Sequence, residues 1–242
     1  MLEALTRRIP VAVPLALVVA LGWLVLEAAA RIGFALAGVL ALGPVVGDTQ
    51  TAAVVGSFFA LLVGMPVAAL LLSRYARWGG QSRSDWDYDW ELRPVAAGLV
   101  AGLLGLAAVA VAQRLDAALF GSNAAAGAAL VGAVEAAPWI ALVLLLGNGV
   151  VGPAAEERVW RGVAQTDLVG RWGVAAGVVV TAVLFSLKHA VIDASLGRPF
   201  TITALGLVWG GVRHRWGTGA STVAHVTTNT VATSQVILLA LG

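Results

Sequence analysis

The chain has 242 residues, of which 60% are hydrophobic and 12% charged, whereas soluble domains carry about a quarter charged residues. Its mean hydropathy of +0.90 excludes an ordinary soluble globule, which needs a polar surface. The net charge of +2 rests on scattered arginines, which argues against nucleic-acid binding, and the lack of cysteine excludes disulfides, thiolate metal sites and a cysteine nucleophile. We therefore predict an all-α polytopic protein with the bilayer as its solvent.

Apolar segments follow one another along the whole chain, and several reach the ~20 residues needed to cross a hydrocarbon core. They cover 11–30, 52–73, 94–113, 128–151, 172–189, 200–213 and 218–240. A shorter apolar piece, 32–46, either extends the first helix or lies in the membrane interface.

The N-terminal segment has two interpretations. Arg7 and Arg8 before an apolar run, with small residues at 28–30, imitate a cleavable secretory signal. An uncleaved first helix explains the same residues, and Glu27 lies four residues before Arg31, the spacing of a helical ion pair.

One clearly polar loop, 74–93, alternates acidic and aromatic residues from Asp85 to Glu91. The pattern D-x-D-x-D opens some calcium loops, but Trp90 stands where such a loop needs glycine. We expect a loop with aromatic anchors at the membrane interface instead.

Ionisable residues inside apolar segments are costly, so they are candidates for function. Glu156, Glu157 and Arg161 lie in a mixed stretch at 153–169, while His189 and His225 lie in apolar segments. The remaining histidine, His214, lies in a basic turn, and we expect it to be a solvated residue.

Helical spacing groups these candidates. Glu157 and Arg161 stand four apart and can pair, whereas Glu156 is turned away by about 100°. His225 and Asn229 stand one turn apart, which presents two donors toward one point. A carboxylate base, a histidine and a pair of donors are the parts that peptide hydrolysis needs.

The order Glu-Glu-x-x-x-Arg, Phe-x-x-x-His, His-x-x-x-Asn resembles the CPBP family, which comprises type II CAAX prenyl endopeptidases, bacteriocin-processing (Abi-like) proteins and their relatives. The matching segments are 156–161, 185–189 and 225–229, with Trp160 where the family usually has Phe. No hydrophilic stretch is long enough for a second domain, so we predict a single membrane domain over 1–242. Within it, the resemblance covers the C-terminal half and implies variable helices in 1–130 and a catalytic core in 131–242.

The resemblance also implies roles for individual residues. Glu156 would be the general base with help from His189, and His225 and Asn229 would stabilise the oxyanion. Glu157, Arg161 and Phe185 would support this group. Glu156, Glu157, His189 and His225 could be mistaken for zinc ligands, but the resemblance favours a glutamate mechanism without metal or other cofactor.

Two topologies compete. If 153–169 is a cytoplasmic loop, seven helices result and loop arginines favour one side, but Glu156 lies far from His189. If 153–169 enters the membrane as its own helix, eight helices result, both termini share one side, and the two residues lie at similar depth. Because a shared site is the harder constraint, we predict about eight helices, with seven as the alternative.

The functional prediction is an intramembrane endopeptidase that cleaves a protein or peptide near the membrane surface, located in the plasma membrane. Whether the substrate is lipidated stays open. The alternatives are a transporter that uses the buried Glu and His residues and a non-catalytic scaffold. A transporter should show matching broken helices in two halves, and residues 1–130 contain no counterpart of the charged motif.

Overall fold

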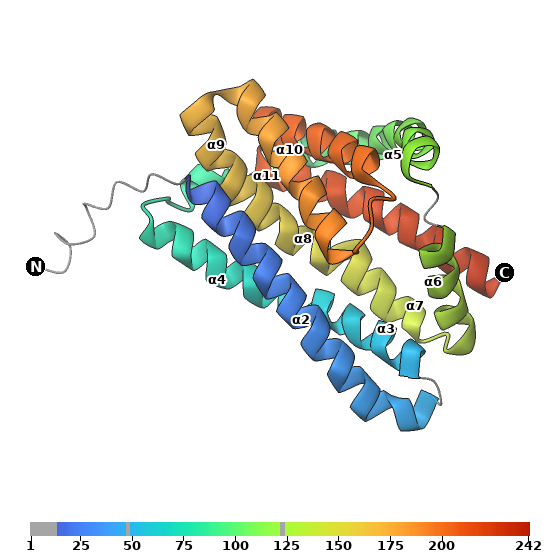
Figure 1. Cartoon of the computed structure of the whole chain (residues 1–242). Coiled ribbons are helices and arrows are strands. Elements are labelled where there is room, and N and C mark those ends of the chain that lie inside the picture. Colours follow the sequence, from blue (N-terminus) through green and yellow to red (C-terminus); the bar gives the residue numbers. More distant parts are fainter. Residues whose placement is uncertain (1–13, 47–48, 122–123) are drawn as a thin grey trace, which may run out of the picture.

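The part of the chain that the structure describes, residues 14–46, 49–121 and 124–242 of a computed structural model, is helical and contains no strand (Figure 1). This confirms the predicted all-α class. The elements are α2 (Leu15–Val46), α3 (Thr49–Phe59), η1 (Ala60–Gly64), α4 (Met65–Trp78), η2 (Ser84–Trp86), α5 (Leu92–Phe120), α6 (Ala124–Ala136), α7 (Ile140–Leu144), η3 (Leu145–Val151), α8 (Gly152–Glu157), η4 (Arg158–Ala164), α9 (Gln165–Trp172), α10 (Val174–Ile192) and α11 (Pro199–Leu241).

Among the described residues, five helical stretches are long and apolar enough to cross a membrane. They are Leu15–Pro44, Thr49–Trp78, Leu92–Phe120, Ile140–Trp172 and Val174–Ile192. Large apolar side chains also point outward, such as Leu40 at 81% and Leu92 at 83% exposure, as expected where lipid replaces water. The chain is therefore a multi-pass membrane protein, while the predicted count of eight helices is not confirmed.

The difference from eight helices arises between 128 and 172. The predicted apolar segment 128–151 is divided between α6 and a new helix that begins at Ile140, after Pro138. The stretch 153–169 does not form a helix of its own, because α7, η3, α8, η4 and α9 run on as one span from Ile140 to Trp172. Its polar residues are compatible with membrane depth because they face the inside of the bundle.

Helix α2 settles the place of residues 32–46, which extend the first helix to Val46. Its Glu27 and Arg31 form the expected ion pair at 2.8 Å, while Arg7 and Arg8 of the signal-like pattern lie outside the described residues. Helix α2 begins at the end of the bundle opposite to the end of α11 (Figure 1). These two helix ends do not fit the eight-helix topology, in which both termini share one side, while residues 1–13 lie outside the described part of the chain.

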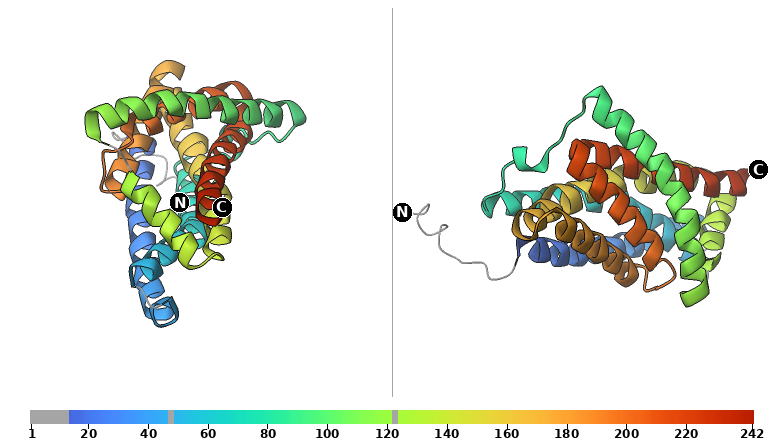
Figure 2. Two further views of the ribbon diagram at one scale, coloured as in Figure 1. Left: turned by 90° about the vertical axis from the view of Figure 1, so that its right-hand side faces the viewer. Right: turned by 90° about the horizontal axis from the view of Figure 1, so that it is seen from above.

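Helix α5 crosses the bundle obliquely and packs on α11 (Figure 2). Glycines permit this close approach: a Cβ on Gly102 would lie 2.7 Å from the Ala224 carbonyl oxygen, and one on Gly98 would strike the Ala220 carbonyl oxygen. The Gly98-x-x-x-Gly102 spacing in the sequence is thus a helix-packing surface of the small-residue kind.

Helix α11 consists of two helices joined at Gly217, whose φ of 82° is left-handed. Such a φ favours glycine, which has no Cβ. The loop after α4 meets this break, since the Thr218 amide donates to the Asp87 carbonyl at 2.6 Å. The loop thereby fixes the start of the helix that carries His225.

In the same loop, one of the expected aromatic anchors, Trp86, is buried instead. Trp90 is 57% exposed, but Trp86 is only 2% exposed. Trp86 lies under the Arg158 guanidinium at 5.5 Å and donates to the Gln81 side chain at 3.0 Å. Burial raises the pKa of the Tyr88 phenol, and the nearby Glu157 carboxylate adds to that rise. The loop is therefore packed into the core beside the Glu pair.

Candidate active site

A helical hairpin brings Glu156 and His189 to the same depth. The span that ends at Trp172 and helix α10, which begins at Val174, turn at Gly173, whose φ is 80°. Glu156 precedes this turn by nearly the same stretch of chain by which His189 follows it. Because both arms of the hairpin are helical and contain nearly the same number of residues, the two side chains lie at similar depth.

The Glu156 carboxylate lies between the two histidines. His189 Nε2 is 3.9 Å from Oε1, and His225 Nε2 is 3.7 Å from Oε2. The shortest contact of the carboxylate is with the Lys188 ammonium, at 2.6 Å from Oε1. Glu156 is 6% exposed and His225 2% exposed, so the group is enclosed by the bundle.

His225 is oriented by Glu157 and Trp209. Its Nδ1 lies 3.0 Å from Glu157 Oε1, and its ring stacks on the Trp209 indole with 3.6 Å between centroids. A carboxylate beside Nδ1 makes that nitrogen the N–H donor and leaves Nε2 facing Glu156. Glu157, the second glutamate of the pair, therefore orients His225 rather than Glu156.

His189 is oriented from the opposite side. Its Nδ1 lies 2.9 Å from the Phe185 carbonyl oxygen, which can only accept, so Nδ1 carries the proton. The Nε2 lone pair then accepts from the Lys188 ammonium at 3.2 Å. The Phe185 ring packs against His189, with 4.6 Å between centroids. Phe185 thus holds the histidine through both its carbonyl and its ring.

Arg161 is fully buried beside Glu157 and Phe185. Its Nε lies 3.7 Å from Glu157 Oε2, and one terminal nitrogen donates to the Gly206 carbonyl at 3.4 Å. The guanidinium also lies over the Phe185 ring at 5.1 Å. Arg161 thus links the Glu pair to α10 and α11.

The Asn229 amide is engaged away from Glu156, at the π-helical turn η3. The Gly152 amide donates to the Gly147 carbonyl in the π pattern, and Pro153, the next residue, has no N–H. The Asn148 carbonyl is therefore left without its helical donor, and Asn229 Nδ2 donates to it at 3.1 Å. Since the amide has two N–H donors, this bond occupies one of them.

Two members of the group, Lys188 and Glu27, are absent from the sequence-based candidates. Lys188 is 3% exposed and bonded to Glu156. The sequence did contain a signal for Lys188, because placing a charged lysine inside the apolar stretch 174–192 costs free energy and by itself marks a candidate functional residue. Glu27 is 1% exposed, and its spacing in the sequence pairs it only with Arg31. Nothing in the sequence pairs it with a lysine so far along the chain.

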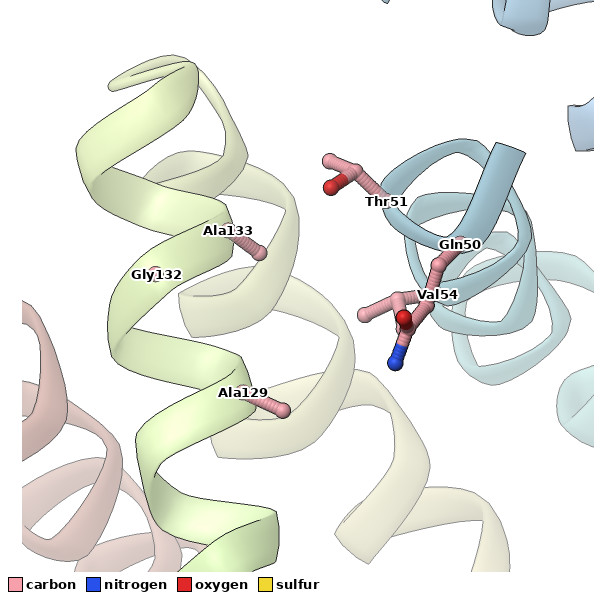
Figure 3. Close-up of a pocket in the computed structure, with 6 residues that line it drawn as sticks. All are labelled: Gln50, Thr51, Val54, Ala129, Gly132 and Ala133. Carbon is pink, nitrogen blue, oxygen red and sulfur yellow. The ribbon is translucent and has the colours of Figure 1, made fainter. Parts of the chain in front are cut away.

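A cavity of about 210 Å³ lies elsewhere, between α3 and α6 (Figure 3). Gln50, Thr51 and Val54 of α3 face Ala129 and Ala133 of α6 across it (Figure 3). None of the motif residues lines this cavity, so it is separate from the group around Glu156.

Comparison with known proteins gives one family match. Searches of curated proteins and of solved structures find no match to the chain. The family model described as type II CAAX prenyl endopeptidase Rce1-like matches residues 138–231, a segment that contains all three motifs. The resemblance inferred from the motifs is therefore confirmed, as a match of residues 138–231 to this family model.

Proposed function

We propose that this chain is an intramembrane endopeptidase of the CAAX-protease type in which Glu156 activates the attacking water. The observation that carries the proposal is the Glu156 carboxylate held between His189 and His225, at 3.9 and 3.7 Å, inside the bundle. A base must reach its proton directly or through one water. Neither histidine nitrogen lies within hydrogen-bond distance of the carboxylate, so its Oε2 can accept a hydrogen bond from the attacking water.

The chemistry then runs in two steps. Glu156 takes a proton from water as the water oxygen bonds to the peptide carbonyl carbon, which gives a tetrahedral oxyanion. When the C–N bond breaks, the same proton passes from Glu156 to the leaving amine. The products are a carboxylic acid and an amine, which become carboxylate and ammonium when the acid proton passes to the amine, and Glu156 returns to its starting state.

His225 and Asn229 are the proposed oxyanion donors. The Glu157 carboxylate beside His225 Nδ1 supports a second proton on Nε2, as the aspartate of a catalytic triad supports its imidazolium. Asn229 has a second amide N–H besides the one given to Asn148. His189, locked by Phe185 and Lys188, would orient the carboxylate and the water beside it.

A mechanism without metal is part of the proposal. The site histidines stand on separate helices, α10 and α11, and do not form the pair four residues apart on one helix that is usual for zinc hydrolases. The cation at the Glu156 carboxylate is the ammonium of Lys188. Zinc that is stoichiometric and required for activity would overturn this part.

The substrate is proposed to be a protein or peptide, with a lipidated chain as one case. Glu156 lies midway along its span, which runs from Ile140 to Trp172. This central position favours a bond drawn into the bundle over one cut at the membrane surface. A plasma-membrane location is also proposed, and membrane fractionation would test it.

The decisive experiment compares protein termini in membrane fractions from cells with wild-type protein and with Glu156→Gln. We expect a set of new termini that disappears in Glu156→Gln and persists in Glu135→Gln, which makes the same change at an exposed carboxylate of α6. Identical termini in wild type and Glu156→Gln would refute the protease, and retained cellular function would favour the scaffold alternative.

A further inference from the structure

Lys188 is the only lysine of the chain and lies buried in the site. Its Nζ is 2.6 Å from Glu156 Oε1, 3.1 Å from Glu27 Oε2 and 3.2 Å from His189 Nε2. An ammonium has three N–H donors, so all of them are used. Lys188 therefore joins α2, α8 and α10 through one charged group.

Glu27 is fixed from three sides, which makes it a rigid anchor. Besides Lys188, the Trp23 indole donates to its Oε2 at 2.7 Å and Arg31 donates to its Oε1 at 2.8 Å. Glu27 belongs to α2, outside the segment that matches the Rce1-like family. Helix α2 thus contacts the site through the Glu27 carboxylate.

With both site histidines neutral, as before any reaction, the charges of this region balance. Three carboxylates, Glu27, Glu156 and Glu157, are in ion pairs with three cations, Arg31, Lys188 and Arg161. A buried charge that loses its partner is strongly destabilising. Without Lys188, both Glu156 and Glu27 would lose a cation at once, and Glu27 alone would keep another, Arg31.

On the basis of the proposed function, we propose that Lys188 is a positioning residue for Glu156 and that Glu27 anchors it. The ammonium binds one carboxylate oxygen, Oε1, and thereby leaves Oε2 on the side of His225. Oε2 is then the oxygen that takes the proton from water. The Lys188 ammonium thus sets the rotational orientation of the Glu156 carboxylate.

The first test is independent of cleavage and uses the purified full chain in detergent. Lys188→Met should lower the melting temperature, because two carboxylates lose their shared cation. Adding Glu27→Gln should recover part of the loss, whereas adding Glu135→Gln at the exposed α6 carboxylate should recover none. If adding Glu27→Gln to Lys188→Met lowered the melting temperature by as much as Glu27→Gln does in the wild-type protein, the proposed bridge would be overturned.

The second test separates positioning from a purely structural role and uses a peptide spanning a cleavage site found in the terminus comparison. In folded Glu27→Gln we expect kcat to fall about tenfold or more, as for a slightly misplaced catalytic group, with KM within about twofold. Unchanged kcat in folded Glu27→Gln and Lys188→Met would overturn positioning. Cleavage that survives Glu156→Gln would instead refute the proposed protease function. The melting temperatures of the first test would still show whether Lys188 bridges Glu27 and Glu156.

Discussion

Replacing Arg161 by methionine removes the cation of a fully buried ion pair. At 3.7 Å from Glu157 and an effective dielectric constant of ~20, the lost attraction is about 4.5 kcal/mol. This agrees with the ~3–5 kcal/mol typical of leaving one buried partner uncompensated. His225 still contacts Glu157, so we expect a loss of about 3 kcal/mol, at the lower end of that range.

The assay is reversible denaturation of the purified protein in detergent, followed by helical circular dichroism. The matched control is Arg171→Met, whose pair with Asp167 is shorter, 2.9 Å, but whose arginine side chain is 41% exposed. Such pairs contribute about 1 kcal/mol or less. Adding Glu157→Gln to Arg161→Met should recover much of the loss. Equal losses in the two arginine variants, or no recovery in the double variant, would refute the reasoning.

Three further predictions concern packing, the amide and metal. Gly102→Ala should destabilise by about 1–3 kcal/mol through overpacking against α11, whereas Gly211→Ala, with open space around it, should not; equal unfolding curves would contradict this. Asn229→Ala should lower turnover by ~10²–10³, whereas Thr230→Val, which frees only the neighbouring Gly149 carbonyl, should retain most of it. Chelator-treated protein should keep full activity, and activity restored only by added zinc would argue against this.

Hydropathy predicted the class of the protein, but the continuity of its helices depended on details that hydropathy does not register. Residues 153–169 are mixed in polarity, so their pattern indicates a break. In the structure Glu156, Glu157 and Arg161 are buried, and α8, η4 and α9 continue the span. Gly147 and Gly149, shortly before Pro153, lie in the π-helical turn η3, an irregularity that leaves the span continuous.

The motifs located the residues around Glu156, but not how they pair. Glu157 and Arg161 could be matched from spacing alone, since one helix carries both. The bond from Glu157 to His225 and the bridge from Glu27 to Lys188 join helices far apart in sequence. The partner of Asn229 could not be predicted from spacing either. It is the Asn148 carbonyl of another helix, which lacks a helical donor because Pro153 has no N–H.

The exposure of the site restricts how a substrate reaches it. The side chains of Glu157, His225 and Glu156 are 0%, 3% and 7% exposed, whereas that of His189 is 13% exposed. His189 lies near the C-terminal end of α10, which is followed by the turn at 193–198 before α11. Glu27 and Lys188 close the side toward α2 with charged contacts, and the loop packed through Trp86 closes the side toward η4. In the proposed mechanism, water and the scissile bond would therefore approach Glu156 past His189, and the imidazole would lie beside the attacking water.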